Sequence, residues 1–247
     1  MLGTFSSTIF TPPKLTSLSW WVDAADTSKI TNVSNAVSQW SDKSGSGWHL
    51  SQATSTLRPA TNLTTRNGLN VITFDGVDDI LTNTSNALFQ NLAGFSWFVT
   101  FQNVNTNISR IVHKVAVTGV NNRAGFSSRR VTTKYEALAR RVDADALSSA
   151  TGTTDTNTTS WMLLGQICNF SAGTNVLRVN RVVEASAATT TGLVENVTGG
   201  ALAVGGNPTP SQWFGGSVGE VVAYDRVLTA SEITQLEEYL RNKWATV

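Results

Sequence analysis

The sequence predicts an all-β sandwich or barrel that ends in one α-helix, and three observations point to this fold class. Short apolar segments alternate with clusters of Gly, Asn, Asp, Ser and Thr along most of the 247 residues, a pattern typical of a sandwich or barrel. Apolar and polar side chains alternate with a period of two around residues 95–101, as they do in a strand. Close to the C-terminus, apolar residues instead recur every three or four positions, as on one face of a helix.

The best-defined strand covers residues 95–101. Its apolar face consists of Phe95, Trp97, Val99 and Phe101. Phe98 interrupts the polar face, so we expect a central strand that is covered on both sides. Residues 177–183 alternate in a similar way. The further predicted strands are 70–74, 110–115, 135–142, 161–170, 201–205 and 219–224. Gly pairs at 199–200, 205–206 and 215–216 predict tight turns, because Gly tolerates positive φ.

One α-helix is predicted, at residues 229–245. Thr229 and Glu232 have the spacing of a capping box, in which each side chain accepts a hydrogen bond from the backbone amide of the other residue. The apolar stripe that follows is Ile233, Leu236, Leu240 and Trp244. We expect this stripe to pack on the sandwich. A second short helix or turn is expected after Pro13, around residues 14–20.

The chain length fits one large all-β domain, and no linker or block repeat divides the sequence. Pro12 and Pro13 mark a boundary, because a residue before proline avoids the helical conformation. We therefore predict an N-terminal arm, residues 1–13, and a single domain, residues 14–247. Cys168 is the sole cysteine and lies in an apolar segment, so we expect a buried strand residue rather than a reactive thiol.

The composition also bears on location. The formal net charge is +1, which gives no long-range attraction to nucleic acid or to a membrane surface. The first ten residues lack the basic region and apolar core of a secretory signal, and no apolar run approaches the roughly 20 residues that span a bilayer. We expect a protein made in the cytoplasm, without a signal peptide and without membrane insertion.

Two stretches of the chain carry recognisable motifs. The first contains residues 21–26, 37–45, 52, 58–59, 67–68 and 71–79; the second is 214–228, followed by the helix. Together they resemble the concanavalin A-like, laminin G-like jelly-roll domains of bacteriophage and bacterial surface proteins. The resemblance implies a two-sheet antiparallel jelly roll. It implies less about function, because this fold serves lectins, hydrolases, adhesins and structural subunits.

Most motif residues are interpreted as architecture. Trp21 and Trp40 are expected in the core, and residues 42–45 and 75–76 have the composition of turns. Asp23 and Asp26 are expected to cap backbone amides of the loop that follows them.

No catalytic residue is predicted. Retaining glycosidases need two carboxylates about 5 Å apart, and on a strand this requires acids at alternate positions. Glu220 and Asp225 are five positions apart and so face opposite ways on a regular strand, while Glu184 and Glu195 are isolated. Two histidines, His49 and His113, do not make a multi-imidazole or Cys/His zinc site.

Other catalytic and nucleotide motifs are missing. The sequence has no phosphate-binding loop, no dinucleotide fingerprint and no Gly-x-Ser-x-Gly elbow. Residue counts alone leave a Ser-His-Asp triad open. We expect a protein that binds or assembles rather than an enzyme.

Two sets of side chains are candidates for binding small ligands. Asp75, Asp78 and Asp79 form the densest acidic cluster, and carboxylate oxygens suit calcium; the alternative is a turn with a solvated strand start. No other cofactor is expected. Trp48 and Trp213 lie in polar, Gly-rich surroundings and are candidate platforms for a sugar ring, the alternative being partly buried packing residues.

A basic segment covers residues 123–141. It holds Arg123, Arg129, Arg130, Lys134, Arg140 and Arg141 against the single acid Glu136. Such a segment fits an acidic neighbouring subunit or an anionic glycan, and equally a solvated sheet face.

Two functions remain open. The main hypothesis is a virion structural protein, such as a phage capsid decoration subunit or a head or tail appendage, assembled in the host cytoplasm. Its partners would be the major capsid protein, other virion proteins and further copies of itself, but not nucleic acid. The predicted assembly contacts are Phe5, Ile9, Phe10, Arg129, Arg130, Arg140 and Arg141. The alternative is a carbohydrate-binding or adhesin module that recognises cell-surface glycans through Trp48 or Trp213.

Overall fold

A computed structural model describes residues 10–104, 108–115, 125–142, 144–156, 159–195, 200–207 and 211–247. The short 3₁₀ helices are η1 (Pro12–Lys14), η2 (Thr27–Lys29) and η3 (Ser55–Leu57), and the α-helix is α1 (Ala230–Trp244). The strands of the first half are β1 (Leu18–Asp23), β2 (Ile30–Val33), β3 (Ala36–Trp40), β4 (Leu50–Ser51), β5 (Ala60–Arg66), β6 (Leu69–Asp75), β7 (Leu81–Asn86), β8 (Gly94–Asn103) and β9 (Ser109–Val115). Those of the second half are β10 (Gly125–Val131), β11 (Lys134–Arg140), β12 (Ser148–Asp155), β13 (Trp161–Asn169), β14 (Thr174–Val179), β15 (Val182–Ala188), β16 (Gly200–Val204) and β17 (Gly215–Tyr224).

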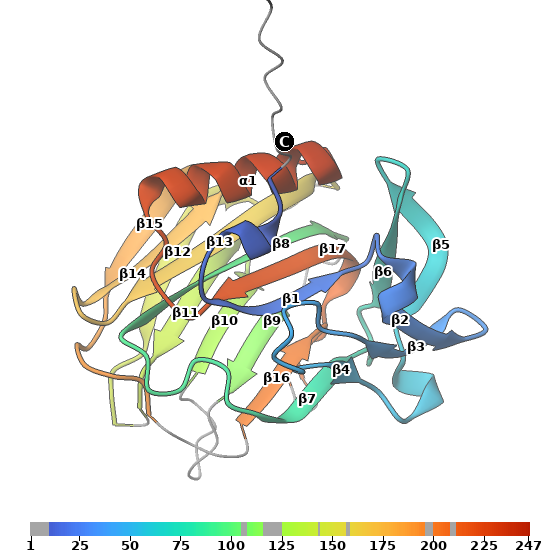
Figure 1. The fold of residues 1–247 in the computed structure, drawn as a ribbon, viewed down its shortest axis with the longest axis horizontal. Coiled ribbons are helices and arrows are strands. Elements are labelled where there is room, and N and C mark those ends of the chain that lie inside the picture. Colours follow the sequence, from blue (N-terminus) through green and yellow to red (C-terminus); the bar gives the residue numbers. More distant parts are fainter. Residues whose placement is uncertain are drawn as a thin grey trace, which may run out of the picture.

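Backbone pairing arranges the strands in two layers (Figure 1). Sheet one has the order β15-β14-β13-β8-β17, and the far edge of β17 pairs with β6 along its first half and with β1 along its second half. Sheet two has the order β12-β11-β10-β9-β16-β7-β4-β3-β2. Strand β5 pairs with both β6 and β3 and so joins the layers. All these pairings are antiparallel, which confirms the predicted two-sheet sandwich.

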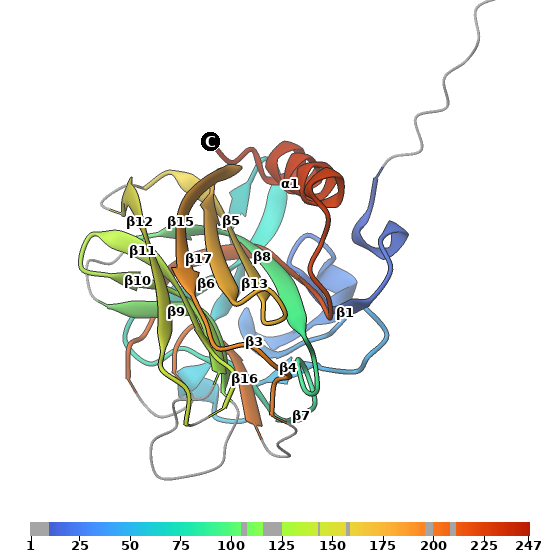
Figure 2. The same cartoon turned by 90° about the vertical axis from the view of Figure 1, so that its left-hand side faces the viewer.

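The core lies between the sheets and is centred on β8. Phe95 and Phe101 point from β8 toward sheet two, where they contact Phe126 and Tyr135. Phe98 points the opposite way and is also fully buried, on the side of sheet one along which α1 lies (Figure 2). The prediction of a central strand covered on both faces is therefore confirmed.

The helix α1 is fixed at both ends. At its start, Thr229 and Glu232 form the predicted capping box. At its end, the β5–β6 hairpin supplies donors to the last carbonyls: Arg66 Nε lies 2.8 Å from the carbonyl oxygen of Trp244, and Asn67 Nδ2 lies 2.9 Å from that of Lys243. Among the described residues, no helix is long and apolar enough to cross a membrane.

One sequence-based prediction of local structure holds in part and another is wrong. Of the short helix or turn predicted around residues 14–20, the turn is present: η1 ends at Lys14, residues 16–17 form a turn, and β1 begins at Leu18. Residues 177–183 are not one strand. Asn180 and Arg181 both have positive φ, 47° and 74°, and make the two-residue turn of the β14–β15 hairpin.

The N-terminal residues that the structure describes pack against the sandwich. Pro12 is buried, and its carbonyl accepts a hydrogen bond from the Tyr224 hydroxyl at 3.0 Å. The division into an arm, residues 1–13, and a domain, residues 14–247, stays a prediction.

Candidate functional site

The outer face of sheet two carries rows of hydrogen-bonding side chains that strand pairing brings together. On β10 and β11, Phe126 and Tyr135 point into the core. Because side chains alternate along a strand, the residues next to Phe126 and Tyr135, and every second residue from there, point away from the core. The same alternation holds at β3 and β4, where Trp40 and Leu50 are buried. We call this outward surface the polar face.

One line of cross-strand neighbours crosses all nine strands of sheet two, and we call it the long row. Its members are Ser149, Leu138, Ser127, His113, Ala203, Thr82, Ser51, Gln39 and Thr31. Seven of these nine side chains can donate or accept a hydrogen bond. Ser149, Ser51 and Thr31 of this row are exposed, whereas its neighbouring members Leu138, Ser127, His113 and Ala203 are buried.

A second, shorter line lies beside the long row and consists of Thr151, Glu136, Arg129 and Arg110; we call it the arginine row. An irregularity in the β9–β10 pairing sets Arg110, rather than Ile111, opposite Arg129, as a β-bulge does when it redirects a side chain. Glu136 accepts hydrogen bonds from Arg129 Nε and from the hydroxyls of Ser149 and Thr151. The carboxylate of Glu136 is therefore fully engaged.

Arg110 has different partners. Its Nε donates to Gln212 Oε1 at 2.6 Å, and its Nη1 lies 2.9 Å from His113 Nδ1. Burial, and next the charge of Arg110, hold the pKa of His113 well below its ordinary value, so His113 is neutral and accepts at Nδ1. Burial and the neighbouring Arg129 lower the pKa of Arg110 to about 10, and Arg110 stays a cation at neutral pH.

Trp213 follows Gln212 directly and is partly exposed. Its ring lies against Gly206, where a Cβ atom would stand 2.7 Å from the ring and 3.6 Å from Ile80. A side chain larger than hydrogen at position 206 would therefore displace the Trp213 ring. Through Ile80, Trp213 is next to the loop that holds the acidic cluster.

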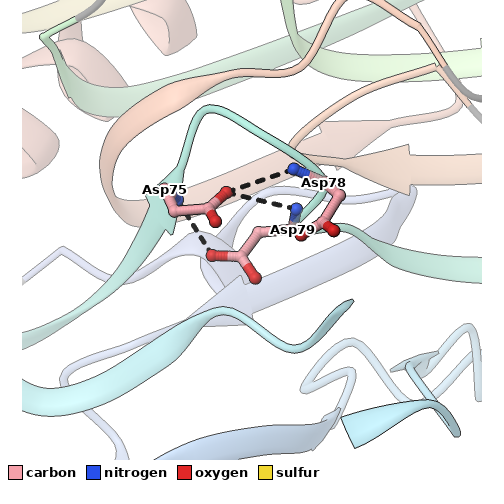
Figure 3. Close-up of side chains that lie close together, drawn as sticks. All are labelled: Asp75, Asp78 and Asp79. Carbon is pink, nitrogen blue, oxygen red and sulfur yellow. Dashed lines mark hydrogen bonds between the residues drawn. The ribbon is translucent and has the colours of Figure 1, made fainter. Parts of the chain in front are cut away.

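The acidic cluster is a closed turn (Figure 3). Asp75 Oδ1 accepts hydrogen bonds from the backbone amides of Val77, Asp78 and Asp79, and Asp79 Oδ2 accepts from the amide of Asp75 at 2.9 Å. One carboxylate oxygen of each Asp lies within 4.8 Å of the others. The structure thus brings the three predicted calcium ligands together, and calcium binding stays a prediction.

The buried carboxyl of Asp79 predicts a pH-dependent stability. Asp79 is 8% exposed, and burial, with Asp75 and Asp78 nearby, raises its pKa to about 6 from an ordinary value of 3.8. The folded protein then holds this proton more tightly than the unfolded chain does. Its contribution to the free energy of unfolding falls as pH rises from about 4 to about 6, by roughly 2–3 kcal/mol.

Urea unfolding of the protein and of Asp79→Asn at pH 4.5 and 7.5, in a chelator, tests this expectation. Asp79→Asn keeps an oxygen acceptor but no charge, so it should be more stable than the parent at pH 7.5 and about equal at pH 4.5. Asp78→Asn, which removes a more exposed charge from the same turn, should have a much smaller effect. An equal effect of the two substitutions would contradict the role of burial.

The other candidate tryptophan, Trp48, is held by packing. Its amide donates to Asp42 Oδ2 at 3.2 Å, its carbonyl accepts from Trp20 Nε1 at 3.1 Å, and its partly exposed ring packs on the core. The prediction that Trp21 and Trp40 lie in the core is confirmed, because both are buried.

The prediction for Asp23 and Asp26 holds in part. Asp23 Oδ1 accepts from the amide of Ala25 at 3.1 Å, as predicted. Asp26 instead accepts from the Ser28 hydroxyl at 2.6 Å. Both carboxylates also pair with Lys43 at 2.9 Å.

The basic segment does not form one surface, because neighbouring residues of a strand point to opposite faces. Arg130 is 1% exposed and donates to Thr156 Oγ1 at 2.7 Å, so the prediction of Arg130 as a surface contact is wrong. Arg129 pairs with Glu136, and Arg141 pairs with Asp145 at 3.1 Å. Arg140 is half-buried. Arg123 lies outside the described residues.

Of the three predicted assembly contacts in the arm, the structure describes one. Phe5 and Ile9 lie outside the described residues. Phe10 packs edge-on against Tyr239 of α1, with ring centroids 5.9 Å apart. Assembly through these residues stays a prediction.

Glu220 and Glu184 have structural partners. Glu220 is fully buried on β17 and accepts hydrogen bonds from Trp21 Nε1 and Trp244 Nε1, both at 2.7 Å, from Lys243 Nζ at 2.8 Å and from the Tyr239 hydroxyl at 3.0 Å. A substrate has no access to this carboxylate. Glu184 accepts from the amides of Thr153 and Thr154, and so ties β15 to β12.

No protein-family model and no curated protein matches the sequence. Solved structures do match. The binding domain of Paraclostridial Mosquitocidal Protein 1 has a TM-score of 0.63 at 12% identity, over 92% of this chain and 53% of that one. Trypanosoma rangeli sialidase in complex with sialic acid has 0.62 at 14%, over 94% of this chain and 34% of that one.

A smaller protein is covered almost completely. The CBM40 of Ruminococcus gnavus IT-sialidase, bound to α2,3-sialyllactose, has a TM-score of 0.52 at 15% identity, over 68% of this chain and 95% of that one. These similarities show that the fold is the concanavalin A-like jelly roll, as the sequence motifs implied. The chain spans about half of the first matched protein and a third of the second.

Proposed function

We propose that this protein is a carbohydrate-binding module, and that it binds sugar at the end of the arginine row where Trp213 lies. The observation that carries the proposal is the meeting of a cation, an amide and a partly exposed indole. Arg110 donates a hydrogen bond to the side chain of Gln212, and Trp213 follows Gln212 in the chain. Sugars present hydroxyls that need donors and acceptors, and apolar C–H faces that pack on aromatic rings.

The remainder of the polar face supports the proposal. Thr151 at the far end of the arginine row, and Ser149 at the adjacent end of the long row, add exposed hydroxyls on β12, three strand spacings or about 14 Å from β9, the strand of Arg110. Similarity in fold to the binding domain of Paraclostridial Mosquitocidal Protein 1 and to a CBM40 bound to α2,3-sialyllactose also supports it.

The test is a glycan array followed by calorimetry with the best oligosaccharide. Trp213→Ala is expected to weaken binding at least tenfold, or about 1.4 kcal/mol, because it removes the stacking surface and leaves the fold in place. Trp48→Ala, the same substitution in a ring that packs on the core, is the matched control and should bind as the parent does. Circular dichroism checks that both variants are folded.

Two results would count against the proposal. Failure to bind any glycan on the array would contradict carbohydrate binding itself. Binding that survives Trp213→Ala but is lost in Trp48→Ala would contradict the location of the site.

A further inference from the structure

The arginine row has an excess of positive charge. It holds two guanidinium groups, those of Arg110 and Arg129, and one carboxylate, that of Glu136. Glu136 bonds to Arg129 and to two hydroxyls. Both partners of Arg110 are neutral, the Gln212 amide oxygen and the unprotonated His113 nitrogen. Within the described part of the chain, no carboxylate forms an ion pair with Arg110.

The guanidinium of Arg110 is held in place and yet partly open. Gln212 engages Nε and His113 engages Nη1, while the described residues leave Nη2 without a hydrogen bond. The side chain is neither buried nor fully exposed. Partial removal of a cation from water without a carboxylate in contact is unfavourable, and burial lowers the pKa of Arg110 although the charge of Glu136 opposes the decrease. An anion brought in by a ligand would offset this cost.

We infer that the sugar bound at this site carries an acidic group, and that Arg110 binds this group. The inference rests on the proposed function. The planar guanidinium presents parallel N–H donors that match a carboxylate, and such charge-assisted pairs are stronger than neutral hydrogen bonds. Gln212 and His113 are positioning residues, since they fix the plane of the guanidinium. A sulfate ester offers similar acceptors and is the other source of an anion.

The experiment compares sugars with and without an acidic group, and the pair that differs only at that group is α2,3-sialyllactose and its methyl ester. The probes are lactose, α2,3-sialyllactose, the methyl ester of α2,3-sialyllactose and 3′-sulfolactose, together with galactan and galacturonan oligomers. The parent protein is expected to bind a carboxylated sugar at least tenfold more tightly than its neutral counterpart, and esterification of the carboxylate should remove this preference.

Arg110→Met is expected to lose the preference for the acidic sugar while it still binds the neutral core. Arg181→Gln, which removes the same charge from the β14–β15 turn, should keep the preference. If Arg110→Met does not fold, the ester comparison on the parent protein still decides the question.

The two proposals fail in different ways. Equal affinity of the parent for neutral and acidic sugars would overturn the role of Arg110 and leave carbohydrate binding intact. A preference that survives Arg110→Met would also overturn it. Tighter binding of the sulfated sugar than of the carboxylated sugar would retain Arg110 as the anion site but overturn the carboxylate as its partner. Binding of no sugar at all would overturn both proposals.

Discussion

Replacing Glu220 by alanine is expected to lower the free energy of unfolding by about 3–5 kcal/mol, because it breaks a buried ion pair and leaves buried indole N–H donors without their acceptor. Glu220 is fully buried. Its two oxygens accept hydrogen bonds from Trp21, Tyr239, Lys243 and Trp244. One carboxylate therefore connects β17 to β1 and to the last turns of α1.

The charges around Glu220 form a chain. Lys243 also pairs with Asp23 at 2.8 Å, and Asp23 pairs with Lys43. Burial, and next the charge of Asp23, raise the pKa of Glu220, while Lys243 opposes the increase. Removal of Glu220 leaves Asp23 as the acid that pairs with Lys243 and leaves the two indole N–H groups without a partner. The cost should therefore fall on the attachment of α1 as well as on β17.

Urea unfolding measures the loss, and Glu238→Ala is the matched control. Glu238 is an exposed glutamate of α1, and its removal should change the free energy of unfolding by less than about 0.5 kcal/mol. Glu220→Gln, which keeps the shape and one acceptor oxygen, should cost less than Glu220→Ala. If Glu220→Ala unfolded at the same urea concentration as Glu238→Ala, the network would carry none of the proposed stability.

Where the sequence predicted the fold correctly, the information was local. The alternation at residues 95–101 indicated β8, because the apolar side chains that face the core and the one that faces the other covered side all lie within seven residues. The helix was predicted from Thr229, Glu232 and the apolar stripe. By contrast, β12 is composed of Ser, Ala, Thr, Gly and Asp, and its sequence resembles a loop. Pairing with β11 makes it a strand.

The candidate site could be predicted less well, because its residues meet only through the fold. Arg110 and Gln212 are 102 positions apart, and they meet where the backbone amide of Arg110 donates to the carbonyl of Gln212, in the segment between β16 and β17. The sequence singled out Trp213 but gave no sign of its neighbours. It also placed Arg129 and Arg130 in one patch, whereas strand alternation sends Arg129 to the polar face and Arg130 into the interior. A cluster in sequence is a cluster in space only when the local geometry keeps the side chains on one side.

Replacing Gln166 by leucine is the second substitution with a large expected effect. Gln166 and Asn175 are fully buried residues of sheet one. Gln166 Oε1 accepts from Trp97 Nε1, and Gln166 Nε2 donates to Asn175 Oδ1 and to the carbonyl of Leu138, each at 2.9 Å. Asn175 Nδ2 donates to the carbonyl of Ala137 at 2.8 Å. Both carbonyls belong to β11, so this pair of amides links sheet one to sheet two.

Leucine has nearly the volume of glutamine but no polar group, so Gln166→Leu leaves the Trp97 indole N–H and the Asn175 amide oxygen buried without partners. Each unsatisfied group costs about 1–3 kcal/mol, and the expected loss is about 3 kcal/mol. Gln235→Leu, at an exposed position of α1, is the control and should have little effect on the urea midpoint.

The double variant separates a linked pair from two independent residues. In Gln166→Leu with Asn175→Leu, the orphaned Asn175 oxygen is gone, so the combined loss should be smaller than the sum of the two single losses by at least about 0.5 kcal/mol. Strict additivity would mean that the two amides act separately. β11 also carries Glu136 of the arginine row, so Gln166→Leu should in addition weaken sugar binding. Unchanged affinity of this variant would show that the polar face keeps its geometry without the hydrogen bonds between the two sheets.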